Sequence, residues 1–175
     1  KNTLPTAIAD SVYNMNVGDV YGPYKDGNFY KATKLIDIKQ VADSVKVRHI
    51  LIPFVGATRV DATVTKTDSE AKKTADSIYT VLKGNRSKYK SLLSLSSDKV
   101  SNEKDGEIEF AYTDSFAPEF RDYSFENKVG DFAVVKTAFG YHIIEILKQG
   151  DRQKAVKIGI LSLPIEPSEQ TIDDV

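Results

Sequence analysis

The sequence predicts an α+β fold in which an antiparallel sheet is surrounded by short helices. Two patterns in the 175 residues carry this prediction. Segments rich in Val, Ile and aromatic residues stop at proline or glycine, as strands do, and they alternate with segments whose apolar residues recur at helical spacing. The last two predicted strands are joined by one tight turn, which makes them antiparallel neighbours.

The first strand of the main region is predicted for residues 45–53, which are rich in Val and Ile and stop at a proline. A long loop follows. Thr67 and Glu70 then form a Thr-x-x-Glu capping box that starts a helix, and Gly84 stops it. Four apolar residues between them share one helix face: Ala71, Ala75, Ile78 and Leu82. This helix is therefore amphipathic.

The remaining elements follow in the order helix, strand, helix, hairpin. Tyr89, Leu92 and Leu93 indicate a second short helix, and the polar residues 98–106 a loop. The predicted elements after this loop are a strand at 107–112, a helix with proline in its first turn at 118–125, and a hairpin of 132–135 with 141–147 that turns near Phe139-Gly140.

The chain also echoes itself. A shift of 112 residues without gaps places Val17-Gly18-Asp19 on Val129-Gly130-Asp131 and Tyr30 on His142. A shift of 111 places Val45-Lys46-Val47 on Val156-Lys157-Ile158 and Pro53 on Pro164. We expect residues 1–44 to be a partial, histidine-lacking half-unit or linker strands, 45–150 a domain, and 151–175 the start of a following segment. A chance likeness of two β-meanders is the alternative.

Composition excludes several functions. Lys and Arg number 24 against 25 Asp and Glu, without a long basic run, so we expect no nucleic-acid partner. The apolar runs are too short for direct membrane insertion. The absence of cysteine excludes disulfides and thiol catalysis, and two histidines without metal-ligand spacing predict no metal and no cofactor. Because the opening residues look like mid-protein sequence, we expect a fragment of a larger chain.

Five motifs occur in an order and spacing that resembles the parvulin family, the PpiC or rotamase type of peptidyl-prolyl cis-trans isomerase. They are Val47-Arg48-His49-Ile50-Leu51-Ile52, Ser96-Ser97-Asp98, Asp105-Gly106-Glu107-Ile108, Phe116-Ala117-Pro118-Glu119-Phe120 and Phe139-Gly140-Tyr141-His142-Ile143-Ile144. The resemblance implies a parvulin-like sheet with flanking partial parvulin-like segments. That arrangement resembles the envelope chaperone-isomerases PpiD and SurA, PpiD more closely. It implies a periplasmic or cell-envelope location, with any membrane anchor outside this segment.

The resemblance also implies a site. His49 and His142 would lie on adjacent strands and hydrogen-bond each other, with Asp98 beside them as the third catalytic residue. The substrate-binding residues it implies are Ile108, Phe116 and Phe120 around the prolyl ring, and Thr137 near the second histidine. The alternatives stay open: a histidine on a strand is often structural, Asp98 suits an ordinary turn, and the two phenylalanines suit a core.

The function implied is isomerisation of X-Pro bonds in unfolded or folding envelope proteins, by non-covalent stabilisation of the twisted amide. Unfolded or proline-containing client polypeptides would be the partners. The alternative is a catalytically weak client-binding module, because Glu109 stands where the family usually has glycine and the flanking units lack histidine. We expect no phosphate requirement, since the loop at 54–68 offers only Arg59 and Lys66, which are separated.

Overall fold

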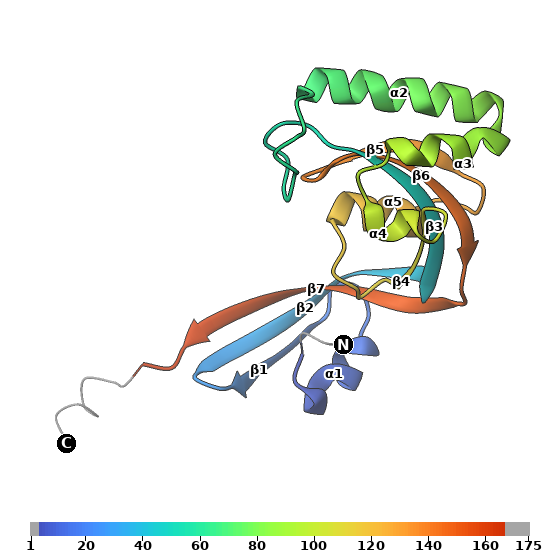
Figure 1. The fold of residues 1–175 in the computed structure, drawn as a ribbon. Coiled ribbons are helices and arrows are strands. Elements are labelled where there is room, and N and C mark those ends of the chain that lie inside the picture. The colour runs from blue at the N-terminus through green and yellow to red at the C-terminus, as the bar shows by residue number, and fades with distance from the viewer. Residues whose placement is uncertain (1–3, 167–175) are drawn as a thin grey trace. The chain divides into compact units, whose positions relative to one another are not determined.

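The computed structural model describes residues 4–166, which divide into two compact units. Residues 41–153 form the central unit. The described residues 4–40 and 154–166 form the terminal unit. The elements of both units are labelled in Figure 1. The segments expected as a partial half-unit before residue 45 and as a following segment after residue 150 thus contribute to one and the same unit.

The central unit is built on a four-stranded sheet. Its strands are β3 (Ser44–Ile52), β4 (Glu107–Ala111), β5 (Phe132–Thr137) and β6 (Gly140–Gln149). They lie in the order β4-β3-β6-β5, and every neighbouring pair is antiparallel. The predicted strands and the predicted hairpin are confirmed, and with them the α+β fold class.

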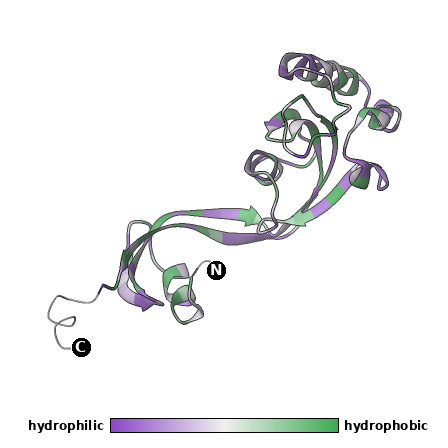
Figure 2. Ribbon diagram, turned by 60° about the vertical axis from the view of Figure 1, so that its left-hand side comes forward, coloured by the Kyte–Doolittle hydropathy of each residue, from purple (hydrophilic) through white to green (hydrophobic). Residues whose placement is uncertain are grey.

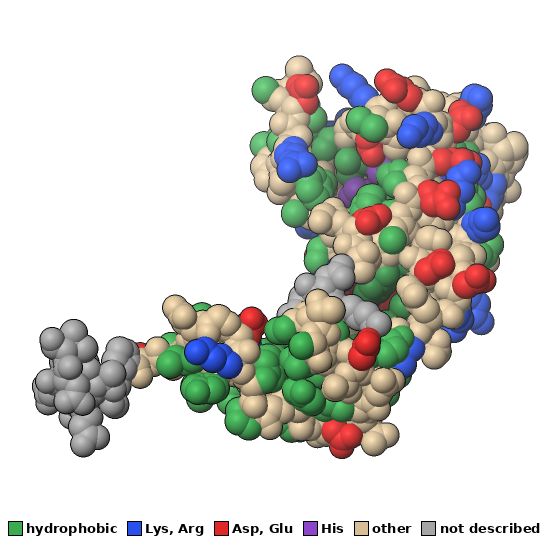
Figure 3. All heavy atoms as spheres, turned by 90° about the horizontal axis from the view of Figure 1, so that it is seen from below, with side chains coloured by type: hydrophobic (Ala, Val, Ile, Leu, Met, Phe, Trp, Pro, Cys, Tyr) green, Lys and Arg blue, Asp and Glu red, His purple; other side chains and the backbone are tan. Residues whose placement is uncertain are grey.

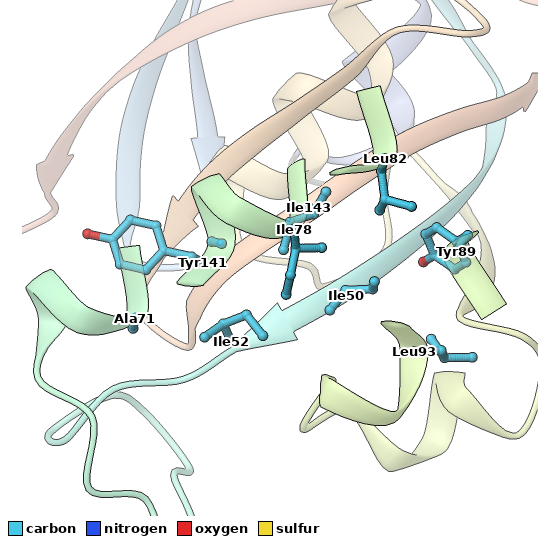
Figure 4. Close-up of a cluster of buried hydrophobic side chains, with 10 residues drawn as sticks. Ile50, Ile52, Ala71, Ile78, Leu82, Tyr89, Leu93, Tyr141 and Ile143 are labelled. Carbon is cyan, nitrogen blue, oxygen red and sulfur yellow. The ribbon is translucent and has the colours of Figure 1, made fainter. Parts of the chain in front are cut away.

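One face of this sheet is covered by the amphipathic helix α2 (Asp68–Gly84). Its capping box is present: the Thr67 backbone N–H donates to Glu70 Oε2 at 2.8 Å, and the Thr67 side chain accepts from the Glu70 backbone N–H at 3.3 Å. The four residues predicted for its apolar face are all buried. Figure 4 shows three of them over the side chains of β3 and β6, in a cluster that includes Ile50, Ile52, Tyr141 and Ile143.

The opposite face is covered by α5 (Pro118–Glu126), which has its proline in the first turn as predicted. Phe120 and Phe125 are buried there in a cluster with Val45, Val47, Ile144 and Ile146. Each fully buried side chain of this size contributes roughly 1.5–3 kcal/mol relative to an exposed one. The sheet is therefore held between two apolar cores.

Short helical turns connect α2 to β4. They are η1 (Arg86–Lys88), α3 (Tyr89–Leu92), η2 (Leu93–Leu95) and α4 (Lys99–Asn102). The expectation of a loop over residues 98–106 was wrong in part, because α4 lies inside it. Asp98 is the N-cap of α4 and accepts a hydrogen bond from the Ser101 backbone N–H at 3.2 Å. Polar residues at the start of a short helix predict a loop from sequence, because helix caps and turns use the same types of side chain.

The terminal unit contains α1 (Thr6–Tyr13), β1 (Val20–Asp26), β2 (Phe29–Ala42) and β7 (Arg152–Pro164). Its sheet has the order β1-β2-β7, and Figure 2 shows apolar residues along these strands as well as on α1. Strands were expected in residues 1–44, whereas α1 was not. Within residues 4–166, no helix is long and apolar enough to cross a membrane.

The pairing of β1 with β2, compared with that of β5 with β6, corrects the alignment between the two halves of the internal echo. Gly18 N–H donates to Leu35 O as Gly130 N–H donates to Ile146 O, so Leu35 is equivalent to Ile146 at a shift of 111. The gapless shift of 112 fails along β2 because an irregularity between Tyr21 and Tyr24 takes up one residue. Lys31, rather than Tyr30, is therefore the equivalent of His142.

Candidate functional site

The two histidines meet across the β3–β6 ladder. His49 lies opposite Ile144, and His142 lies opposite Leu51, so the imidazoles are diagonal neighbours on one sheet face. Their Nδ1 atoms are 3.2 Å apart, and the rings are stacked with centroids 5.4 Å apart. Both side chains are buried. The sheet thus joins two residues that are 93 positions apart in the sequence.

Asp98 lies at the outer end of this pair. Its Oδ2 is 2.9 Å from His49 Nε2, while its Oδ1 caps α4. The hydrogen bond from His49 is the main reason that the pKa of Asp98 lies far below its usual value, and the bond from the Ser101 backbone adds to it. Asp98 is therefore a carboxylate at neutral pH, and both of its oxygens have partners.

Thr137 lies at the other end. Its hydroxyl is 2.8 Å from His142 Nε2 and accepts a hydrogen bond from the Phe139 backbone N–H at 3.1 Å. Thr137 is only 4% exposed. The structure places Thr137 behind the histidines, in their hydrogen-bond network, rather than on the wall of the cleft.

One set of hydrogen-bond directions satisfies every member of this network with both imidazoles neutral. Because the Asp98 carboxylate only accepts, His49 donates from Nε2, and in this neutral tautomer its Nδ1 accepts. His142 then donates from Nδ1 and accepts at Nε2 from the Thr137 hydroxyl. The pKa of His142 is lowered to about 3, mainly by burial and then by the neighbouring His49, while Asp98 opposes this shift by a smaller amount. His142 is therefore neutral at pH 7, as this chain of donors requires.

The histidines form part of the floor of a cleft of about 370 Å³. Ile108, Phe116 and Phe120 line it, and Figure 3 shows the histidines (purple) in a hollow among apolar side chains. The Phe120 ring stands edge-on to both imidazoles at 5.2 and 5.1 Å, and Phe116 stacks on Phe120 at 5.7 Å. The site therefore combines a polar, fully paired floor with apolar aromatic walls.

Sequence reasoning missed several residues of the cleft. They are Leu51, Arg59, Ser115, Ala117 and Phe139. Ser101 was also missed: its hydroxyl is 3.2 Å from His49 Nε2. Its position three residues after an Asp cap was the available signal. Arg59 reaches this cleft from the loop after β3, and Lys66 is not among its lining residues.

Glu109, which replaces the usual glycine, lines a different hollow. That hollow, of about 520 Å³, adjoins the cleft and includes Lys46 and Glu107. Glu109 is not among the residues that line the cleft around the histidines. The extra carboxylate therefore changes the charge beside the cleft rather than its interior.

The comparisons with known proteins agree with this fold. Residues 30–150 match the model of the PPIC-type PPIASE domain family. The chaperone SurA of Vibrio parahaemolyticus is 31% identical over 160 residues, which is 87% of this chain and 36% of that protein. SurA of Aliivibrio fischeri is 29% identical over 163 residues, 89% of this chain and 36% of that protein. The chain thus spans about a third of the length of these relatives.

A solved structure shows the same fold. The peptidyl-prolyl isomerase ESS1 from Candida albicans superposes with a TM-score of 0.55 at 20% identity, covering 61% of this chain and 63% of that one. The class is therefore the parvulin-type rotamases, and this chain belongs to the PPIC-type peptidyl-prolyl isomerase family. The expected resemblance to SurA is confirmed, while a closer relation to PpiD stays a prediction.

Proposed function

We propose that the chain accelerates cis/trans isomerisation of X-Pro bonds in unfolded or folding polypeptides. The observation that supports it best is the buried network under the cleft, in which all four nitrogens of His49 and His142 have a partner within 3.2 Å. No imidazole nitrogen is left over to attack a substrate. A reaction that makes and breaks no covalent bond suits such a site.

To accelerate isomerisation, a site needs only to stabilise the twisted amide relative to the planar one. The barrier to rotation is about 18–20 kcal/mol because twisting removes amide resonance. The twisted amide is less polar than the planar one, so apolar walls that exclude water favour it. Ile108, Phe116 and Phe120 are proposed to hold the prolyl ring. His49 and His142 are the proposed catalytic residues, and Asp98 and Thr137 are positioning residues that fix the tautomers of the two imidazoles.

The proposed substrates are proline-containing client polypeptides of the cell envelope, and the proposed location is the periplasm, as part of a longer protein. Both similar relatives carry the name chaperone. Within the cleft, Arg59 is the only Lys or Arg side chain among the described lining residues. One cation does not provide the paired contacts that suit a phosphate dianion, so we propose that clients need no phosphate.

A client-holding module with little turnover is the second candidate. The terminal unit favours it, because it keeps the same hairpin with Lys31 where the central unit has His142. A scaffold of this kind therefore persists without the histidine network.

Exchange NMR or a protease-coupled assay on proline peptides separates the two candidates. We expect acceleration by the wild-type chain, and a loss of about tenfold or more in His49→Ala and in His142→Ala, equivalent to about 1.4 kcal/mol of transition-state stabilisation. Lys31→Ala is the matched control and should leave the rate unchanged. If the histidine variants keep the acceleration, the catalytic role of the two histidines is excluded. If micromolar wild-type chain gives no acceleration, isomerisation is excluded. Retained binding of an unfolded client would then favour the holding module.

A further inference from the structure

The outer edge of the central sheet is formed by β4. Within residues 4–166 this strand pairs with β3 on one side and has no strand on the other. Along an antiparallel edge strand, every second residue directs its N–H and C=O away from the neighbouring strand. The His49 N–H donates to Gly106 O at 3.0 Å, which fixes this alternation. Glu107, Glu109 and Ala111 are therefore the residues of β4 whose backbone groups face outward.

The two ends of this outward row already have partners. The Glu107 N–H donates to Lys104 O, and the Ala111 N–H donates to Asp114 Oδ2, each at 2.9 Å. The Ala111 carbonyl accepts from the Asp114 N–H at 3.0 Å. Glu109 lies between these ends, and neither its N–H nor its C=O has a hydrogen-bond partner among the described residues. The edge is therefore open for pairing at Glu109.

The hollow of about 520 Å³ lies beside this open position. Side chains from both faces of β4 line it, Glu107 and Glu109 from one face and Ile108 from the other. The hollow therefore follows the outer edge of the strand rather than one face of the sheet. Val100, which is 75% exposed, belongs to the opposite wall, at α4. The hollow thus has the position that an added strand would take.

The hollow is continuous with the cleft around the histidines. Asp98, Ile108 and Phe116 line both of them. A client whose prolyl ring lies in the cleft therefore has its neighbouring residues at the entrance to the hollow. The residue before a proline is restricted to extended conformations. This part of the client thus already has the backbone conformation of a strand.

We propose that the open edge of β4 at Glu109 is a second binding site for the client, which adds an extended segment beside its proline to the central sheet. The Glu109 N–H donates to a client carbonyl, and the Glu109 C=O accepts from a client N–H. Recognition through backbone groups tolerates many sequences, as unfolded clients require. This inference rests on the proposed function, because that function places the client's proline in the cleft.

Charge favours a client over a second copy of this chain. A two-fold pair centred on Glu109 would place two Glu109 carboxylates opposite each other, and like charges in that position are unfavourable. Lys46, the partner of Glu109 on β3, forms its ion pair with Glu107 at 2.5 Å. The Glu109 carboxylate has no ion pair in the part of the chain that the structure describes. The client residue beside Glu109 should therefore preferably be Lys or Arg.

Amide hydrogen exchange of the 175-residue chain, with and without a proline peptide, tests this proposal. The probe is a peptide of about ten residues with one central proline and uncharged flanks, which at about 3.3 Å per residue extends well beyond the cleft. We expect saturating peptide to slow exchange of the Glu109 amide roughly tenfold or more. The Ala111 amide, which already donates to Asp114, is the internal control and should not change.

Glu109→Pro removes the outward N–H at a position where the pairing with β3 does not use it. It should weaken binding of the longer peptide about three- to tenfold. Binding of a shorter peptide, of about four residues, should stay within about twofold, because it does not extend past the cleft. Glu109→Ala keeps the N–H and is the matched control, which should bind the uncharged longer peptide within about twofold of wild type.

Placing Lys in the flank of the longer peptide should favour the wild-type chain over Glu109→Ala by about twofold. The exchange of the Phe110 amide reports whether β3 and β4 remain paired in the proline variant. Where that pairing is lost, exchange of the wild-type Glu109 amide decides.

A Glu109 amide that exchanges equally with and without peptide overturns the proposal. So does a proline variant that remains paired and binds the longer peptide as wild type does, and so do equal losses in Glu109→Pro and Glu109→Ala. Protection of Glu109 that rises with protein concentration without peptide assigns the edge to a second copy, which also overturns it. Peptide binding at Glu109 without accelerated isomerisation would instead overturn the proposed function and leave this inference standing.

Discussion

The hairpins of the two units have the same register next to the turn but differ in the side chains that they carry there. The central hairpin carries His142 hydrogen-bonded to Thr137, and the terminal hairpin carries Lys31 paired with Asp26 at 2.7 Å in the equivalent positions. At the position of His49, the internal echo has Ile160. The imidazoles are buried, whereas the Lys31 and Asp26 side chains are 24% and 37% exposed.

This difference separates folding from function. The terminal unit forms its sheet with Ile and Lys where the central unit has two histidines, so the backbone does not need the imidazole network. Burying two imidazoles is unfavourable for stability unless each nitrogen has a partner. The central unit provides those partners, which favours a functional role for the network.

The largest contrast should be in core packing. Ile50 is fully buried under α2, and its counterpart Leu161 is 62% exposed. Ile50→Ala should lower the free energy of unfolding of the central unit by about 2–5 kcal/mol, because it leaves a cavity. Leu161→Ala should change the stability of the 175-residue chain by less than about 0.5 kcal/mol. Denaturant unfolding measures both, and similar losses would mean that Leu161 is already covered in this chain.

The next contrast is in pH dependence. The pKa of His142 is about 3 when folded, against an ordinary value of 6.5, so between these pH values the unfolded chain binds more protons. The central unit should therefore lose stability as pH falls, by roughly 2–3 kcal/mol between pH 6.5 and 4.5, and the lowered pKa of Asp98 adds in the same direction at lower pH.

His142→Gln should flatten this part of the pH profile, because the amide does not titrate there. Lys31→Gln makes the matched change in the terminal unit and should leave the profile unchanged. Denaturant unfolding at several pH values provides the measurement. A slope that persists in His142→Gln would assign the acid sensitivity to other groups.

The sequence predicted what periodicity and caps determine. Strand β3, the α2 helix with its Thr67–Glu70 box, and the β5–β6 hairpin are at their expected places because each has a local signal. Helix α4 and the one-residue irregularity in β1 were not foreseen. Short capped turns resemble loops, and a ladder irregularity leaves no mark on a gapless self-comparison.

For the site, the resemblance supplied the candidate residues, and the strand pairing determines their geometry. His49, His142 and Asp98 were selected through resemblance, but their hydrogen-bond directions depend on Thr137 and on the α4 cap. Ser101 and Arg59 reach the site through turns that carry no periodic pattern. Such contacts are tertiary, so propensity and spacing do not predict them.

Two glycines with positive φ make a third contrast. A Cβ on Gly106 would lie within 3 Å of the His49 carbonyl, the Tyr89 hydroxyl and Leu93, whereas a Cβ on Gly27 meets nothing within 4 Å. Both alanine variants bear the cost of a positive φ. Gly106→Ala should cost about 1–3 kcal/mol more than Gly27→Ala, from steric overlap. It should also shift the imidazole NMR signals of His49, because the His49 backbone N–H donates to Gly106 O. Equal costs would show that the central unit yields to the added methyl group.

The smallest contrast concerns the two polar pairs themselves. Thr137→Val removes the hydroxyl that donates to His142 Nε2, so this buried nitrogen loses its partner. The free energy of unfolding should fall by about 1–3 kcal/mol. Asp26→Asn weakens the partly exposed pair with Lys31 and should cost about 0–1 kcal/mol. Thr137→Val should also move the side-chain ¹⁵N shifts of His142, because its tautomer loses the hydroxyl donor that favours Nδ1–H. Unchanged ¹⁵N shifts would mean that Asp98, through His49, is enough to orient the whole network, and Thr137 would then contribute packing alone.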